Sequence, residues 1–116
     1  MTRIFTVEEI RDEEKVELLS KHGTIFPLTS IAKTPIPVIW NTYEMSKWIQ
    51  DCIALNPFDY SRDYLALTGN YLALSQLIAT LVVQDVSPYK IKCLSFSRSK
   101  GANEYSHVVL EEFVSP

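Results

Sequence analysis

The sequence predicts a single α/β domain, in which about three helices pack on a mixed sheet of four or five strands. Segments with helical periodicity alternate along the chain with short apolar runs that are typical of strands. Strand, helix and strand follow one another through residues 64–97, which favours one right-handed parallel crossover. The last two strand-like runs are joined by a glycine-containing loop, which indicates a C-terminal antiparallel hairpin.

Length and composition are those of an ordinary globular domain. The chain has 116 residues, of which 47% are apolar and 22% charged, so we expect one domain over residues 1–116. No apolar run reaches the roughly 20 residues needed to span a bilayer. The N-terminal stretch turns acidic where a signal peptide would be apolar. We therefore expect a cytoplasmic protein with no membrane segment.

The two cysteines, Cys52 and Cys93, follow no spacing typical of a metal or redox site. Each lies among apolar neighbours, which favours buried thiols over a disulfide. Free thiols agree with the reducing environment of a cytoplasm.

The first half of the chain predicts two helices. Thr6 and Glu9 fit a capping box that would start the first helix, and Gly23 is placed to end it. Asn41 is placed to start the second helix, which would end near Asn56. A core stripe on this second helix consists of Met45, Trp48, Ile49, Cys52 and Ile53. Between the helices we expect a strand over Thr24–Leu28, a loop or sheet edge over Ser30–Pro37, and a possible edge strand over Pro37–Trp40.

The second half predicts one more helix and three strands. These elements are a strand over Tyr64–Leu67, a helix over Tyr71–Gln84, and strands over Tyr89–Ser97 and Tyr105–Phe113. In the last strand, Tyr105 and His107 should share one face, while Ser106 and Val108 share the other.

The turn Thr68-Gly69-Asn70 allows two interpretations. As a structural corner, glycine permits the sharp turn and Asn70 caps the following helix. As a binding site, the free N–H groups at the helix start would hold an anion, at the sheet edge where α/β proteins bind ligands. The turn has a single glycine and no following lysine, whereas dinucleotide and P-loop motifs need more.

The helix that follows this turn is apolar on most of its sides. A helix of this kind is buried on most of its sides, and a small chain offers little cover, so either the helix that contains Met45–Ile53 or another subunit packs over it. We therefore expect a homo-oligomer, in which small residues on the helix permit close approach of a second helix. The interface candidates are Tyr71, Leu74, Leu77, Ile78 and Leu81.

The chain shows no recognisable catalytic, metal or cofactor motif. His22 and His107 lack an obvious carboxylate partner. Asp59 and Asp63 are interpreted as turn-capping residues, and the alternative is a carboxylate pair for metal or acid–base chemistry. The one basic region consists of Lys90, Lys92, Arg98 and Lys100. It lacks the aromatic pattern of an RNA-recognition fold, and the net charge of −3 also makes nucleic acid an unlikely partner.

The stretch "NPFDYSRDYLALTGNYLALSQLIATLVV", with "YKIKCLSFSRS" and "EYSHVVLE" after it, resembles a pattern in small uncharacterised proteins of tailed-phage and prophage genomes. In these proteins an aspartate, a short apolar strand, a Thr/Ser-Gly-Asn/Asp turn, an apolar helix and two closing strands recur. The resemblance covers residues 56–112. It implies a phage or prophage accessory protein in the host cytoplasm, and it assigns no catalytic residue.

Together these observations favour a small non-enzymatic protein-interaction or assembly protein, acting on a host or virion component. The alternative is a phosphate- or nucleotide-binding α/β domain that uses the Thr68-Gly69-Asn70 turn. A third hypothesis is a nucleic-acid contact through the hairpin from Lys90 to Lys100.

Overall fold

The strands of this chain form one five-stranded mixed sheet with the order β2-β1-β3-β4-β5. We describe it from a computed structural model, for residues 2–37, 42–83, 90–99 and 102–109. Strands β1 to β4 run parallel, and β5 is antiparallel to β4, as the sequence predicted for the closing hairpin. The strands are β1 (Arg3–Thr6), β2 (Thr24–Pro27), β3 (Tyr64–Ala66), β4 (Lys92–Ser99) and β5 (Ala102–Val109).

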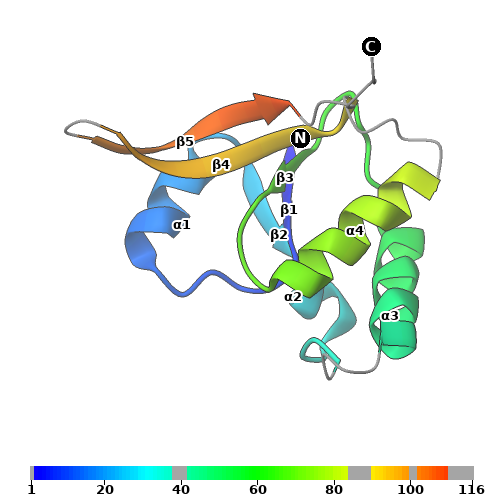
Figure 1. The fold of residues 1–116 in the computed structure, drawn as a ribbon. Coiled ribbons are helices and arrows are strands. Elements are labelled where there is room, and N and C mark those ends of the chain that lie inside the picture. The colour runs from blue at the N-terminus through cyan, green and yellow to red at the C-terminus, as the bar shows by residue number, and fades with distance from the viewer. Residues whose placement is uncertain (1, 38–41, 84–89, 100–101, 110–116) are drawn as a thin grey trace, which may run out of the picture.

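Helices cover both faces of the sheet (Figure 1). One face carries α1, whose Leu19 packs with Ile4, Ala66 and Leu94 of the strands. The other face carries the remaining three helices, which share a larger apolar core with Phe5. The helices are α1 (Glu13–Ser20), α2 (Leu28–Ala32), α3 (Thr42–Leu55) and α4 (Tyr71–Val83). The predicted α/β domain with a mixed sheet and a closing hairpin is confirmed.

Strand β1 replaces the start of the first predicted helix. Ile4 and Phe5 lie between β2 and β3 with no exposed surface, so this short run is a central strand. Thr6 ends the strand and donates its hydroxyl to the backbone carbonyl of Glu8. The helix begins later, where the Asp12 carboxylate accepts from the N–H groups of two following residues. The capping box at Thr6 was therefore a wrong prediction.

Helix α2 lies where the sequence predicted a loop or sheet edge over Ser30–Pro37. Pro27 ends β2 and precedes the helix, where its missing N–H costs nothing. Leu28 is fully buried in the larger core, and this burial stabilises the short helix α2. Lys33 ends the helix in the left-handed conformation, with φ 57°. The possible edge strand at Pro37–Trp40 falls mostly on residues outside the described part of the chain.

The stripe predicted on the second helix is confirmed in α3. Met45, Ile49, Cys52 and Ile53 are at most 3% exposed, and Trp48 packs against them from the edge of the core. Helix α4 lies beside α3 on the same face of the sheet (Figure 1). Cys93 of β4 is also buried, so both cysteines are free thiols in the core, as predicted.

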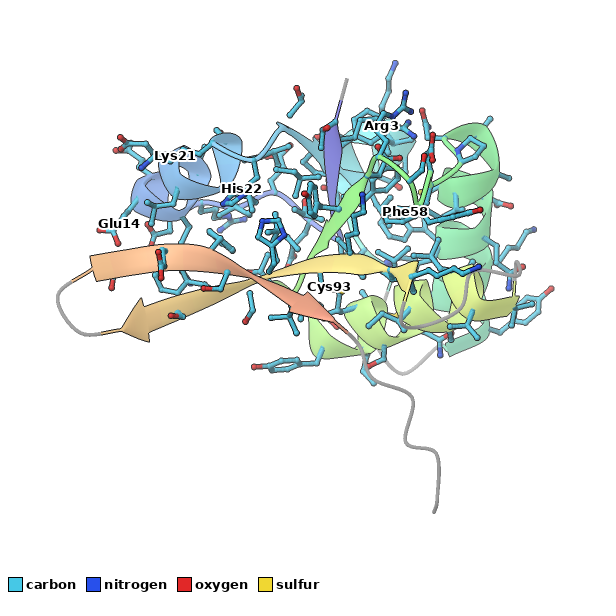
Figure 2. All side chains as sticks on the ribbon, turned by 90° about the horizontal axis from the view of Figure 1, so that it is seen from above. Arg3, Glu14, Lys21, His22, Phe58 and Cys93 are labelled. Atoms are coloured by element: carbon cyan, nitrogen blue, oxygen red, sulfur yellow. The ribbon has the colours of Figure 1, made fainter. Side chains whose placement is uncertain are left out.

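The hairpin β4–β5 extends beyond the other strands and bends over α1. The predicted faces are confirmed, because Tyr105 packs in the smaller core and Val108 against the larger one. Near the hairpin tip, the side-chain amide of Asn103 donates to the carboxylate of Glu14, over a distance of 2.6 Å. Figure 2 shows Glu14 on α1 beside this end of the hairpin.

Candidate functional site

The connections that follow the neighbouring strands β1 and β3 lie on opposite faces of the sheet. The connection after β1 passes through α1 on one face, and the connection after β3 passes through α4 on the other. In open α/β sheets, ligands bind in the crevice that such a divergence leaves at the carboxyl ends of the strands. The loop 7–12 and the turn 67–70 form this crevice here.

The Thr68-Gly69-Asn70 turn lies at this crevice and is a structural corner. Gly69 has φ 92°, a conformation that side chains with a Cβ atom rarely adopt. The Asn70 side-chain oxygen accepts a hydrogen bond of 3.1 Å from the backbone N–H of Ala73. Asn70 therefore caps α4, as the structural interpretation of the turn predicted.

A carboxylate of the chain itself lies where an external anion was expected. The N–H of Asn70 donates to Oε1 of Glu8 over 3.1 Å, and the Glu8 side chain also lies against Gly69. A negative charge at this place is stabilised by the positive end of the helix dipole. The sequence predicted a helix over Glu8, so this contact was not predicted.

Three hollows surround Glu8 at the same edge of the sheet. One of about 180 Å³ lies in the crevice between the loop 7–12 and Thr68-Gly69. A second of about 440 Å³ opens over Gly69, Asn70 and the start of α4. The third, of about 650 Å³, lies between the loop 7–12 and the segment that follows α2. These three hollows therefore meet at Glu8, at the carboxyl edge of the sheet.

The interface candidates on α4 divide between the core and the surface. Leu74, Leu77 and Leu81 are at most 9% exposed, because the sheet and α3 cover them. The prediction that these leucines need a second subunit as cover is corrected by this packing. Ile78 is half-buried against the same core, and Tyr71 is 84% exposed.

The outward face of α4 carries further apolar side chains that the sequence analysis did not single out. Leu72 is 47% exposed and Val83 is 83% exposed. Between α3 and α4 runs a groove of about 550 Å³. Its lining residues are Ser46, Gln50, Asp51, Ala54, Gln76, Ala79, Thr80 and Val83.

The predicted basic region is not one cluster. Lys90 and Lys92 lie at the start of β4, with their ammonium groups 5.6 and 5.8 Å from the ring centres of Tyr60 and Tyr64. Arg98 lies near the other end of β4, about 20 Å away at roughly 3.4 Å per residue. Lys100 lies outside the described residues. Lys92 also donates to the backbone carbonyl of Ser61 over 2.9 Å, so the two lysines contact the segment that leads into β3.

Asp59 and Asp63 are structural, as the sequence predicted for turn-capping residues. Asp63 is fully buried and accepts from the guanidinium and the backbone N–H of Arg3. Asp59 accepts from the backbone N–H and the hydroxyl of Ser61. Figure 2 shows Arg3 on the side of the sheet that α3 covers.

Burial of the Asp63 carboxyl opposes its ionisation, but its contacts outweigh that cost. Hydrogen bonds from Arg3 and from the backbone of Asp59 hold the pKa of Asp63 below its ordinary value. The pair joins β1 to the loop before β3.

The two histidines, distant in sequence, lie together in the fold. The ring centres of His22 and His107 are 5.5 Å apart, and the ring of Tyr64 lies 5.3 Å from that of His107. Within the described ranges, no three histidine, cysteine or acidic side chains gather in a group that could hold a metal ion.

Comparison with family models, with curated proteins and with solved structures finds no match to this chain. No helix in the described part of the chain is long and apolar enough to cross a membrane.

Proposed function

We propose that the chain is a protein-interaction or assembly protein that contacts its partner through the outward faces of α3 and α4. The observation that carries this proposal is the exposure of apolar side chains on α4, a helix that contains no charged residue. Tyr71 and Val83, at its two ends, are 84% and 83% exposed. Large exposed apolar side chains on one helix are typical of contact sites in soluble proteins.

The neighbouring helix extends the same surface. Tyr43 and Leu55 of α3 are each 76% exposed, so large apolar side chains stand on both helices. Between the two helices, the small side chains of Ala54 and Ala79 line the groove together with polar residues such as Gln50 and Gln76. A partner helix could therefore approach the two backbones closely.

We infer that the partner is a second copy of the chain. The surface offers both a ridge, formed by the exposed side chains of α4, and a groove beside it, which can receive the ridge of another copy. A two-fold axis would let each copy present its ridge to the groove of the other. The absence of charge on α4 means that two identical helices meet without electrostatic repulsion.

Light scattering after size-exclusion chromatography tests the proposal. We expect the wild-type chain to elute with twice the mass of one chain. The double variant Leu72→Glu/Val83→Glu should elute as a monomer with an unchanged far-UV circular dichroism spectrum, because both side chains are exposed in the single chain.

The control for this experiment is Ser20→Glu. This variant adds one negative charge, as each substitution on α4 does, at an exposed position of α1 on the opposite face of the sheet. It should leave the dimer intact. A wild-type chain that remains monomeric at the highest attainable concentration would contradict self-association. Dissociation of the Ser20→Glu control would show that the contact lies elsewhere.

A further inference from the structure

The hollow between the loop 7–12 and the segment after α2 is an open cavity with a mainly polar lining. Its volume of about 650 Å³ is within the range of ligand pockets in proteins. It lies where the parallel strands β1 and β2 end, which is the edge at which α/β sheets bind ligands. Its lining residues are Glu8, Glu9, Arg11, Thr29, Lys33, Thr34, Pro35 and Ile36.

The two cations of this cavity lack partners, whereas its two carboxylates have them. Arg11 and Lys33 are exposed, and in the part of the chain that the structure describes neither side chain makes an ion pair or a hydrogen bond. Glu8 accepts from the N–H of Asn70, and Glu9 accepts from the hydroxyl of Ser30 over 3.0 Å. The cavity therefore presents two positive groups that are available to an anion.

The backbone at Lys33 gives a second reason to assign its side chain a role. Lys33 is the only non-glycine residue with positive φ among those that the structure describes. A glycine would end α2 in the same conformation without the steric cost of a Cβ atom. Strained backbone of this kind gathers at binding sites, where the side chain is needed.

The wall of the cavity also contains a hydroxyl without a hydrogen-bond partner. Oγ1 of Thr29 is buried and unpaired within the described structure, which is costly in a protein interior. Thr34, on the other wall, is held to α3 by a hydrogen bond of 2.9 Å from the indole N–H of Trp48.

We propose that this cavity binds a small molecule with one anionic group, a carboxylate or a phosphate monoester, and with hydroxyl or ammonium donors. The anionic group contacts Arg11 and Lys33, since a guanidinium and an ammonium group are the usual partners of such anions. The donors contact the free oxygens of Glu8 and Glu9. A polyanion such as a nucleoside triphosphate is disfavoured, because the two carboxylates repel its additional charges.

Thermal unfolding with four probes tests this assignment: glycerol 3-phosphate, serine, inorganic phosphate and ATP. We expect glycerol 3-phosphate or serine to raise Tm in proportion to the logarithm of its concentration. Inorganic phosphate and ATP should have smaller effects. A comparison of the first two probes distinguishes a phosphate from a carboxylate as the anionic group.

Two variants separate binding from folding. Arg11→Gln should raise the Kd of the effective probe by roughly tenfold or more, as expected for one lost charge-assisted hydrogen bond. Lys33→Gly should raise Tm without a probe, because the backbone is relaxed, and should nevertheless weaken binding. These opposite changes are not expected of a residue with a purely structural role.

The control is Lys47→Gln, which removes an exposed positive charge from α3 and should leave binding unchanged. The assignment is overturned if none of the four probes raises Tm. It is equally overturned if Arg11→Gln and Lys33→Gly bind the effective probe as tightly as the wild type, or if ATP or inorganic phosphate stabilises most.

Discussion

The carboxylate of Asp63 is fully buried and accepts a hydrogen bond of 2.8 Å from the guanidinium of Arg3, sixty residues earlier in the chain. The same guanidinium donates to the carbonyl of Pro57, and the N–H of Asp59 donates to Asp63. One ion pair thus fixes the first strand to the loop that leads into the third. Because the pair is away from the carboxyl edge of the sheet, its role is structural.

Replacement of Asp63 by asparagine should destabilise the fold by about 3 kcal/mol, since the Arg3 guanidinium then loses its charged partner in a largely buried position. Urea unfolding at pH 7 measures this loss. Asp51→Asn, an exposed site on α3, is the control and should change the free energy of unfolding by less than about 0.5 kcal/mol. A loss below 1 kcal/mol for Asp63→Asn would contradict a structural role of the pair.

The same pair predicts the response of the fold to acid. The pKa of Asp63 is lower in the folded chain than its ordinary value of 3.8, so the folded state binds its proton less tightly than the unfolded state. Its contribution to stability is therefore complete above pH 3.8 and is lost as the pH falls through the lower folded-state pKa. Unfolding free energies between pH 2 and 7 should show this loss in the wild type and a shallower slope in Asp63→Asn.

Glu8→Ala should destabilise the protein by roughly 0.5–2 kcal/mol, because α4 loses an acceptor and a negative charge at its first turn. The N–H of Asn70 also becomes available. We therefore expect sulfate to raise the Tm of Glu8→Ala more than that of the wild type. Glu17→Ala, on the exposed side of α1, is the control, and an equal sulfate response in all three proteins would refute an occupied anion position at this turn.

Gly69→Ala should cost roughly 1–3 kcal/mol of stability. Its φ of 92° is unfavourable for alanine, and the added Cβ would lie 2.7 Å from Cγ2 of Val7. The double variant Gly69→Ala/Val7→Ala relieves only the contact. If the double variant has the same free energy of unfolding as Val7→Ala alone, backbone strain at residue 69 is negligible and the prediction is wrong.

Both thiols should resist modification in the native state. Burial raises the pKa of the Cys93 thiol to about 11, and burial together with the nearby Asp51 raises that of Cys52. The reactive thiolate is therefore scarce at pH 8. Reaction with a chromogenic disulfide reagent should proceed only as fast as the chain opens, and it should accelerate steeply in urea. Rapid labelling of the native protein would contradict this burial.

Lys33→Gly should stabilise the chain by roughly 0.5–1 kcal/mol, because glycine adopts the left-handed backbone of this position without steric cost. Lys33→Ala removes the same side-chain charge and keeps the strain, so it should give no comparable gain. Urea unfolding of the two variants measures the difference. Equal stability of glycine and alanine at this position would show that the backbone is not strained there.

Local signals predicted some parts of this fold well. Two confirmed features depend only on residues that are close in the sequence. They are the apolar stripe of Met45, Ile49, Cys52 and Ile53 and the turn before Tyr71. Strand β1 was missed because the spacing of Thr6 and Glu9 imitates a helix start. Its strand character comes from burial between β2 and β3, which local periodicity does not reveal.

The candidate site was less predictable than the fold. The contact between Glu8 and Asn70 joins residues 62 positions apart, and it depends on the strand order. The same holds for Arg11 and Lys33, which line one cavity only because β1 and β2 are neighbours. The hydrophobicity of α4 indicated that most of its side chains are buried. Which of them are buried within the single chain depends on the packing against the sheet, which the sequence of the helix does not show.

The central place of β1 has a consequence for synthesis on the ribosome. Its neighbour β3 is translated about sixty residues later, which takes several seconds at roughly 5–20 residues per second. During that interval Ile4 and Phe5 of the nascent chain have an open hydrogen-bonding edge and no complete apolar cover. The pairing of β1 with β3 can therefore be completed only after residue 66 has left the exit tunnel.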